Sequence, residues 1–307
     1  MSDNLNIYFL GTSSSTPTKD RNLTSVLLKY KGENYLFDAP ENVQQQIMKV
    51  GQSILKINNI FITHLHGDHF FGIVGLLATM QLNQRTNPLD IYVPIGYKLK
   101  LFRFIKSSLL QFGFKINIFE IKSNKKINFK NAVVTSIKLN HSILTYGYNF
   151  KIKDKIGKFV KSKALKLKIP EGILFSKLQS GKSIKLNGKI IKPEQVMNYN
   201  FKKIGTSISY MTDTMTLKKV PLVVKNSDVL IHEACFIKEH ADRAKETMHS
   251  VSGDVALFAK KANAKKLFLV HVSSRYSDKK QTLKESKKYF KNSFTPDDLS
   301  SLEISDY

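Results

Sequence analysis

Short apolar segments alternate with polar connections along most of the chain, and the spacing of the apolar residues distinguishes two kinds of element. Brief runs rich in β-branched and aromatic residues predict strands, at 6–10, 24–30, 35–38, 60–62, 89–93, 116–121, 132–139, 207–213, 228–235 and 266–270. Longer runs of good helix formers predict helices, at 41–50, 70–80, 97–111, 250–259 and 279–290. Because the two kinds of element follow one another in this way, the chain predicts a layered α/β fold.

Residues 151–203 interrupt this pattern. They contain fifteen lysines against three acidic residues, and six glycines and prolines break any periodicity. Two apolar patches, at 165–169 and 173–175, argue against plain disorder. We therefore expect an inserted basic arm, and favour an anionic partner over a merely solvated run of charge.

The densest polar chemistry lies directly after the strand predicted at 60–62. There, His64, His66, Asp68 and His69 fall within six residues, between a strand end and a helix start. Ligands of α/β folds bind at strand ends, and His and Asp are common ligands of first-row metals. These four residues predict a metal site that can divide between two adjacent ions; the alternative is a polar loop without metal.

Further residues able to bind metals stand at the ends of later strands. They are His141, Asp213, His232 and His271. Any one of them alone would more often be structural, but strand ends converge at one edge of a layered sheet structure. We therefore expect them near the first cluster, whereas His240 has no such position and is expected at the surface.

Composition limits the class of protein. The 307 residues are 42% hydrophobic, which is enough for one large or two small packed cores. The single cysteine, Cys235, excludes an intrachain disulfide and a site made of thiolates alone. The N-terminus has no signal-peptide pattern and no apolar run reaches the length of a membrane span, so a cytoplasmic protein that does not bind membranes is expected.

Charge and two loop features leave alternatives open. A net charge of +25 suits a polyanionic partner, although AT-rich coding also enriches lysine. The loop at 12–22 carries hydroxyls with Lys19 and Arg21, which suits phosphate contacts or an ordinary strand connection. Asp38 precedes the helix predicted at 41–50 and is interpreted as its cap rather than as support for a metal ligand.

The motif His64-x-His66-x-Asp68-His69 resembles that of the metallo-β-lactamase superfamily. Within it, the chain is most similar to the short form of the ribonuclease Z family, the tRNA 3′ processing endonucleases. The matching positions are 11–17, 19–22, His141-Ser142, Asp213-Thr214, His232-Glu233-Ala234, His249-Ser250, His271 and Ser274-Arg275-Tyr276. The resemblance implies a metallo-β-lactamase fold, a four-layer αββα sandwich formed by 1–307 as a single domain, with 151–203 as an inserted flexible arm.

The resemblance also implies roles for individual residues. Seven of them would hold two zinc ions per subunit: His64, His66 and His141 for one, Asp68, His69 and His271 for the other, and Asp213 between the two. Asp68 would be the general base, and His249, oriented by Glu233, would protonate the departing 3′ oxygen, with His232 a weaker candidate for support or phosphate contact. Residues in contact with the substrate would be Lys19, Arg21, Asn22, Ser274 and Arg275.

The function implied by the resemblance is removal of the 3′ trailer from precursor tRNA. A metal-activated water would attack the phosphodiester, leaving a 3′-hydroxyl on the tRNA and a 5′-phosphate on the trailer. The arm would hold the tRNA elbow, and the enzyme would be a homodimer. Cys235 and Val251 replace two expected threonines, and the arm has no Gly-Pro pair. The alternatives are a small-molecule phosphodiester or ester hydrolase and an inactive RNA-binding protein.

Overall fold

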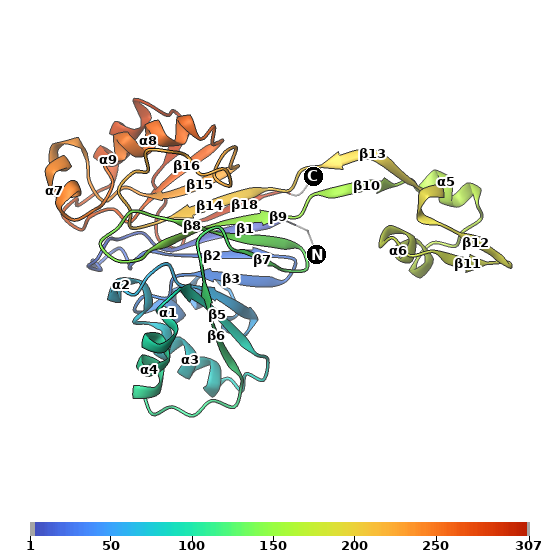
Figure 1. Cartoon of the computed structure of the whole chain (residues 1–307), viewed down its shortest axis with the longest axis horizontal. Helices are drawn as coiled ribbons and strands as arrows, with labels where there is room; N and C mark the ends of the chain where they lie inside the picture. The colour runs from blue at the N-terminus through green and yellow to red at the C-terminus, as the bar shows by residue number, and fades with distance from the viewer. Residues whose placement is uncertain (1–3, 306–307) are drawn as a thin grey trace. The chain divides into compact units, whose positions relative to one another are not determined.

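The structure is a computed structural model that describes residues 4–305, and the chain forms two compact units. The first unit comprises the residues up to Lys151 and those from Thr206 onward, and the second is Ile152–Gly205. Figure 1 shows the chain coloured from its N-terminus to its C-terminus, with the second unit drawn in light green and yellow.

The first unit is built on two seven-stranded sheets, each with parallel and antiparallel pairs. The first sheet has the order β18 (Ser301–Ile304), β1 (Leu5–Gly11), β2 (Ser25–Tyr30), β3 (Glu33–Phe37), β4 (Ile57–Phe61), β5 (Leu89–Pro94), β6 (Ile116–Ile121). The second has the order β17 (Ser293–Phe294), β16 (Lys266–Val270), β15 (Val229–Glu233), β14 (Ser207–Met211), β9 (Tyr146–Ile152), β8 (Ala132–Lys138), β7 (Lys126–Asn128).

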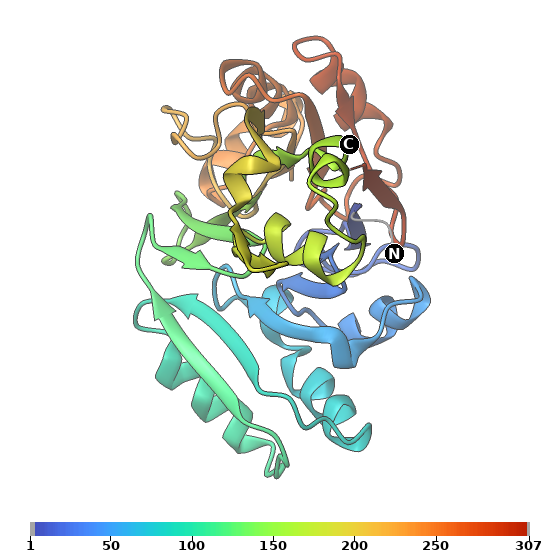
Figure 2. The ribbon, with the colours of Figure 1, turned by 90° about the vertical axis from the view of Figure 1, so that its right-hand side faces the viewer.

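Helices cover the outer face of each sheet. The helices after β3 are α1 (Val43–Lys49), α2 (Gly67–Phe70), α3 (Ile73–Leu82) and α4 (Lys98–Ser107). The later helices are α7 (Ala241–Glu246), α8 (Ser252–Lys261) and α9 (Lys280–Lys287). Buried residues of α1, α3 and α4 share one core with the first sheet, and α8 packs on β15 and β16. Figures 1 and 2 show the two sets of helices on opposite sides of the sheets, which confirms the predicted α/β layers.

Aromatic side chains fill the space between the two sheets. The ring of Phe61 in β4 lies 5.3 Å from that of Tyr148 in β9, and the ring of Phe37 lies 5.8 Å from that of Tyr210. Such ring pairs contribute about 0.5–1.5 kcal/mol each beyond the area they bury. They hold the strand ends of the two sheets in fixed positions, which matters because those ends carry the polar clusters.

The second unit has a small core of its own. It contains the ribbon β10 (Lys155–Phe159) with β13 (Met197–Lys203), the hairpin β11 (Ile184–Leu186) with β12 (Lys189–Ile191), and helices α5 (Lys161–Lys166) and α6 (Ile173–Gln179). The buried residues of this core are Ala164, Ile169, Phe175, Leu178, Ile184, Ile191 and Val196. Both apolar patches of the sequence analysis, at 165–169 and 173–175, thus contribute residues to a packed core and do not form a disordered segment.

Two helix starts differ from the sequence prediction. The helix expected at 70–80 is divided at Gly72, where a Cβ atom would lie only 1.8 Å from the Pro40 carbonyl oxygen, so close packing on 39–40 sets the break. We expected Ser250 or Ser252 to cap α8, but neither side chain does so. The Glu285 carboxylate of α9 accepts the backbone N–H of Gly253 instead, at 2.8 Å. No helix in residues 4–305 is long and apolar enough to span a bilayer.

Candidate metal centre and active site

Seven predicted ligands meet at one edge of the two packed sheets. His64 and His66 follow β4, and α2 carries Asp68 and His69. The remaining three follow β8, β14 and β16 and are His141, Asp213 and His271. They form two groups whose ligand atoms lie within 4.8 Å of one another, and Asp213 belongs to both groups.

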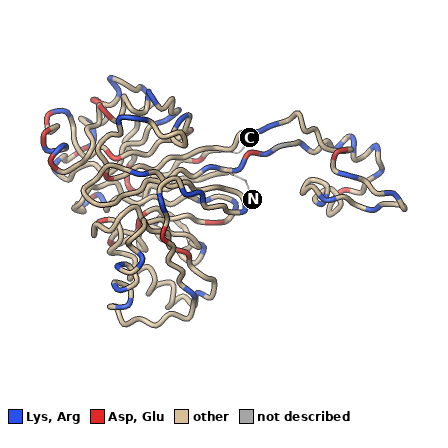
Figure 3. Tube along the Cα trace, in the orientation of Figure 1, with Lys and Arg blue, Asp and Glu red and all other residues tan. Residues whose placement is uncertain are grey.

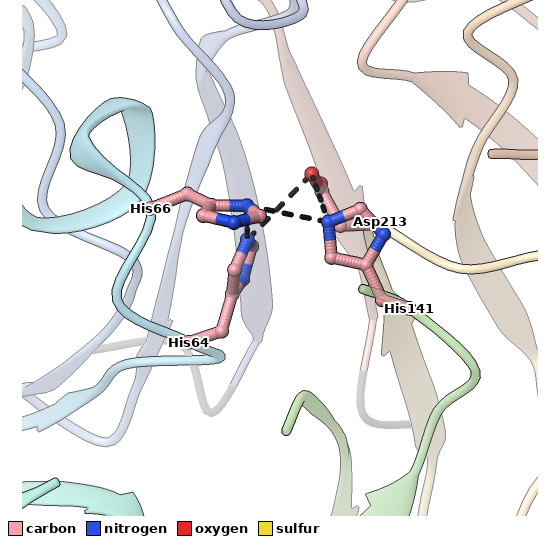
Figure 4. A group of neighbouring side chains, drawn as sticks. All are labelled: His64, His66, His141 and Asp213. Carbon is pink, nitrogen blue, oxygen red and sulfur yellow. Dashed lines mark hydrogen bonds and ion pairs between the residues drawn. The ribbon is translucent and has the colours of Figure 1, made fainter. Parts of the chain in front are cut away.

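The first group brings three imidazoles together (Figure 4). His64 Nε2 lies 2.9 Å from His66 Nδ1, which in turn lies 3.2 Å from His141 Nε2. Asp213 Oδ2 completes the group, at 3.7 Å from His64 Nε2 and 3.8 Å from His141 Nε2. Imidazole nitrogens and a carboxylate oxygen at these separations can surround one metal ion of the first row.

The second group lies on the other side of the same carboxylate. Asp213 Oδ1 is 3.1 Å from His69 Nε2 and 3.2 Å from His271 Nε2. Asp68 Oδ2 is 3.4 Å and 3.5 Å from the same two nitrogens. Because each oxygen of Asp213 faces a different group, this residue is placed to bridge two ions. The positive φ of Asp213, 38°, is an unusual backbone conformation of the kind found at functional sites.

Buried nitrogens without hydrogen-bond partners show that the residues fit a metal. His69 Nε2 and both ring nitrogens of His271 make no hydrogen bond among the described residues, although both side chains are almost fully buried. Leaving such groups unpaired in the interior is costly. A metal ion held by the second group would satisfy the Nε2 atoms of both residues, so the donor set fits a metal there.

Supporting hydrogen bonds fix the orientation of three of the imidazoles. His69 Nδ1 donates to Asp38 Oδ2 at 2.8 Å, and His141 Nδ1 donates to the Met248 carbonyl oxygen at 3.1 Å. The hydroxyl of Thr63 lies 3.0 Å from His64 Nδ1 and from the Asp38 carboxylate. Such partners hold a ring so that its other nitrogen faces the metal.

The interpretation of Asp38 as a helix cap is wrong. The residue at the N-terminus of α1 is Asn42, and the fully buried Asp38 carboxylate instead accepts hydrogen bonds from His69, Thr63 and the Tyr210 hydroxyl. Its distance in sequence from His69 hid this role, because only the pairing of β3 with β4 brings the two together.

Protonation differs between the two groups. Burial lowers the pKa of His64, His66 and His141, so these rings are neutral and able to ligate at neutral pH. Burial also acts to lower the pKa of His69 and His271, but the Asp213 and Asp68 carboxylates outweigh it and raise both. In the second group, protonated imidazoles thus lie beside carboxylates, and a bound metal cation would take the place of the protons on the imidazoles.

His249 and Glu233 form a pair beside these groups. His249 Nδ1 lies 2.8 Å from Oε1 of the buried Glu233, which also accepts the backbone N–H of Thr214. Although burial acts against it, the Glu233 carboxylate raises the pKa of His249 to about 9. The His249 ring stacks at 5.3 Å on that of His271 and therefore stands at the metal groups. A protonated imidazole in this place can donate a proton.

The sequence predicted His232 near the metal cluster and His240 at the surface, and it gave the Cys235 side chain no position. His232, which was expected near the first cluster, belongs to neither metal group: it is buried, its Nδ1 donates to the Glu233 carbonyl oxygen, and its ring lies 5.7 Å from that of Phe258. His240 is only partly exposed and its Nδ1 bonds to the Tyr276 hydroxyl at 2.9 Å. The Sγ atom of Cys235 lies 3.2 Å from the Ser14 hydroxyl and within 4.8 Å of ring nitrogens of His249 and His271, and burial raises the pKa of this thiol to about 12.

The loop residues expected to contact substrate differ in their contacts: some bind other loops, and others are exposed. The Arg21 guanidinium donates to the carbonyl oxygens of Val272, Ser273 and Tyr276, so it joins two loops. Lys19 and Ser274 are exposed and line, with Arg21, a cavity of about 710 Å³. Substrate contact by these residues stays a prediction.

Asn22 and Arg275 complete the expected set. The Asn22 side chain donates to the Glu41 carbonyl oxygen at 3.1 Å, which again ties one loop to another. The exposed Arg275 guanidinium lies 5.4 Å from the Phe236 ring centroid, a cation–π distance. The backbone N–H of Ser15 donates to Asp68 Oδ2 at 3.1 Å, so the loop at 12–22 reaches the metal groups, a link that the sequence did not predict.

The two mixed sheets lie between layers of helices, and two His/Asp groups share Asp213 at the edge of the sheets. This arrangement is that of a metal-binding enzyme with the metallo-β-lactamase fold. A metallo-β-lactamase fold protein from Bacillus subtilis superposes with a TM-score of 0.70 over 98% of this chain and 100% of its own, at 15% identity. The chain belongs to the ribonuclease Z family, the tRNA 3′ endonucleases of this superfamily.

Full-length relatives carry this assignment. A ribonuclease Z of Methanosarcina acetivorans is 39% identical over 301 residues, which are 98% of each chain. The crystal structure of human tRNase Z, short form, shares the fold with a TM-score of 0.66 at 24% identity, covering 97% of this chain and 98% of its own. Residues 5–176 also match the model of a second family, described as anti-Pycsar protein Apyc1, so the chain belongs to that family as well.

Proposed function

We propose that this chain is a zinc-dependent endoribonuclease that removes the 3′ trailer from precursor tRNA. The observation that carries the proposal is the Asp213 carboxylate, whose two oxygens face two separate His/Asp groups. Membership of the ribonuclease Z family supports the substrate. Imidazole and carboxylate groups are common zinc ligands.

The seven ligands would hold two metal ions, which would acidify a bound water and stabilise the charge that develops on the phosphodiester. Asp68 is the proton acceptor for the attacking water, and the N–H of Ser15 holds its Oδ2 in place. Water adds to phosphorus, and the bond from phosphorus to the 3′ oxygen of the tRNA breaks. His249, whose Nδ1 is held by Glu233, gives its Nε2 proton to that oxygen. The products are a 3′-hydroxyl on the tRNA and a 5′-phosphate on the trailer.

The second unit is proposed to bind the folded part of the tRNA. Residues 152–205 hold fourteen lysines and three acidic residues, a net charge of +11 from 14 − 3. Figure 3 shows Lys and Arg positions spread over this unit, with acidic positions sparse. Lysines on a folded support suit contact with phosphates and recognition of RNA shape, without reading of base sequence.

A homodimer is part of the same proposal. Leu99 and Phe102, on the outer face of α4, are 56% and 47% exposed, and together with Lys98 and Glu120 they line a hollow. An apolar patch of this kind is typical of a protein interface. In a twofold dimer, Lys98 of one copy can meet Glu120 of the other. Light scattering should give twice the chain mass for the wild type, and the chain mass for Leu99→Glu combined with Phe102→Glu.

Cleavage of a precursor tRNA, with both product ends mapped, tests the enzyme activity. We expect a 3′-hydroxyl on the tRNA, a 5′-phosphate on the trailer, loss of activity with a chelator and recovery with added zinc. Hydrolysis of a small chromogenic phosphodiester without cleavage of the tRNA would support the small-molecule hydrolase instead. Fewer than one metal ion per chain, with no activity after zinc addition, would support the inactive RNA-binding protein.

A further inference from the structure

The ribbon formed by β10 and β13 in the second unit carries two exposed aromatic rings. Tyr199 and Phe201 are 47% and 39% exposed. The two residues stand two positions apart in β13. Since β10 and β13 pair only with each other among the described residues, the outer edges of this ribbon are unpaired.

An irregularity in the pairing places the rings. Lys158 pairs with Asn198 and Ile156 with Lys202, so the three residues 199–201 lie opposite Gly157 alone. Extra residues of this kind bend a strand and re-aim its side chains. All three residues of this irregular stretch are exposed.

Gly157 is required by the position of Tyr199. A Cβ atom at residue 157 would lie 3.1 Å and 3.2 Å from two atoms of the Tyr199 ring and 3.0 Å from Met197 Cε. The ring thus lies against the backbone of β10, with one face supported by the ribbon. Gly157 also has φ = +90°, which other residues rarely adopt. The missing side chain and the positive φ of Gly157 together leave room for the Tyr199 ring.

Positive charge surrounds the rings. Lys158 Nζ lies 5.7 Å from the Phe201 ring centroid, and residues 152–205 carry the net charge of +11. An exposed aromatic pair among lysines has the composition of surfaces that stack nucleobases and neutralise phosphates. A protein partner with an apolar surface would not use this excess of lysine, so the charge favours RNA as the occupant.

We propose that Tyr199 and Phe201 form a stacking platform for unpaired nucleobases of the RNA substrate. The inference rests on the proposed function and adds to it a contact with bases, whereas lysines alone would contact phosphates. The platform lies wholly within the second unit, so its action does not depend on the groups that carry out hydrolysis. It should therefore affect binding of the substrate and leave the chemical step unchanged.

Fluorescence provides a direct test, because the chain contains no tryptophan. Tyr199→Trp introduces a single tryptophan on the platform, which can be excited at a wavelength that the tyrosines of the chain do not absorb. Ile190→Trp places a tryptophan at an aliphatic position of the same unit that is 67% exposed. Precursor tRNA, titrated with chelator present to prevent cleavage, should quench the first protein by stacking and leave the second nearly unchanged. Heparin, a polyanion without bases, should quench neither. Equal quenching of both proteins, or quenching of Tyr199→Trp by heparin, would overturn the proposal.

Kinetics give the second test. Tyr199→Ala combined with Phe201→Ala should raise KM for precursor tRNA about tenfold, the effect expected of lost base stacking, with kcat and small-phosphodiester hydrolysis unchanged. The matched control, Ile190→Ala combined with Ile173→Ala, should leave KM unchanged. An unchanged KM in the aromatic variant refutes the platform, whereas failure of the wild-type protein to cleave precursor tRNA refutes the proposed function. The fluorescence result then still reports on RNA stacking.

Discussion

The two units of this chain handle charge in opposite ways. In the first, Asp213, His69 and His271 are buried, and the Asp213 carboxylate faces the two imidazoles at 3.1 Å and 3.2 Å. In the second, fourteen lysines are distributed around a small core and most of them are exposed. Buried charges interact strongly and depend on geometry, whereas exposed charges are screened and act by their number. Single changes should therefore be severe in the first unit and mild in the second.

The largest effect is expected for Asp68→Ala. Removing the proposed proton acceptor and metal ligand should lower kcat for precursor tRNA on the order of a thousandfold. RNA binding should stay within about twofold, because exposed lysines supply it. Single-turnover cleavage and filter binding measure the two quantities. Loss of binding together with cleavage would mean that the variant is misfolded, which circular dichroism would detect.

Removing the second unit should have the next largest effect. A short Gly-Ser linker in place of residues 155–203 should lower kcat/KM for precursor tRNA on the order of a hundredfold, because many phosphate contacts are lost together. Hydrolysis of a small phosphodiester should continue at the wild-type rate. The affinity of the shortened protein for RNA should also depend less steeply on salt. If both substrates are cleaved as before, the second unit has no part in recognition.

Asp38→Asn tests the support behind the metal ligands. The amide keeps the size of the carboxylate but removes its charge, so His69 loses its strongest partner. Partners of this kind change metal affinity by about 10–100-fold, which competition with a chromogenic chelator would measure. Asp242→Asn, at an exposed position of α7, is the control and should keep the wild-type affinity. Equal affinities in the two variants would show that Asp38 is only structural.

Single lysines of the second unit should give the smallest effects. Lys189→Gln removes one exposed charge, and the slope of log affinity against log salt should fall by about one if that charge meets a phosphate. Lys266→Gln, at the start of β16 and away from the strand end that leads to His271, should leave the slope unchanged. A severe loss from Lys189→Gln alone would contradict the contrast between the units.

Much of the fold was predictable because local pattern and burial agree. Strands such as β1, β5 and β16 begin and end within a residue or two of their apolar runs. The helix breaks were less predictable, because contacts from distant segments set them: Pro40 fixes the break at Gly72, and Glu285 caps α8. Residues 151–203 lacked a clear period, since their short elements pack around a core of only a few side chains.

The candidate site shows the same division. The sequence by itself determined which residues can bind metal, because His64, His66, Asp68 and His69 are close in the chain and later strands end in His141, Asp213 and His271. The place of Asp213 between the two groups was implied by the family resemblance, and the tertiary structure gives its distances. Only the tertiary structure decided that the supporting carboxylate of His69 is Asp38.

The same holds for the loop contacts. Arg21 could be recognised in the sequence as a cation, but its commitment to three carbonyl oxygens appears only when two distant loops meet. The physical reason is common to all these cases: chemical identity is local, whereas hydrogen bonds and ligand geometry depend on side-chain directions that strand pairing and sheet packing set. The sequence thus identified the chemistry, and the packing of two sheets gave each group its partner.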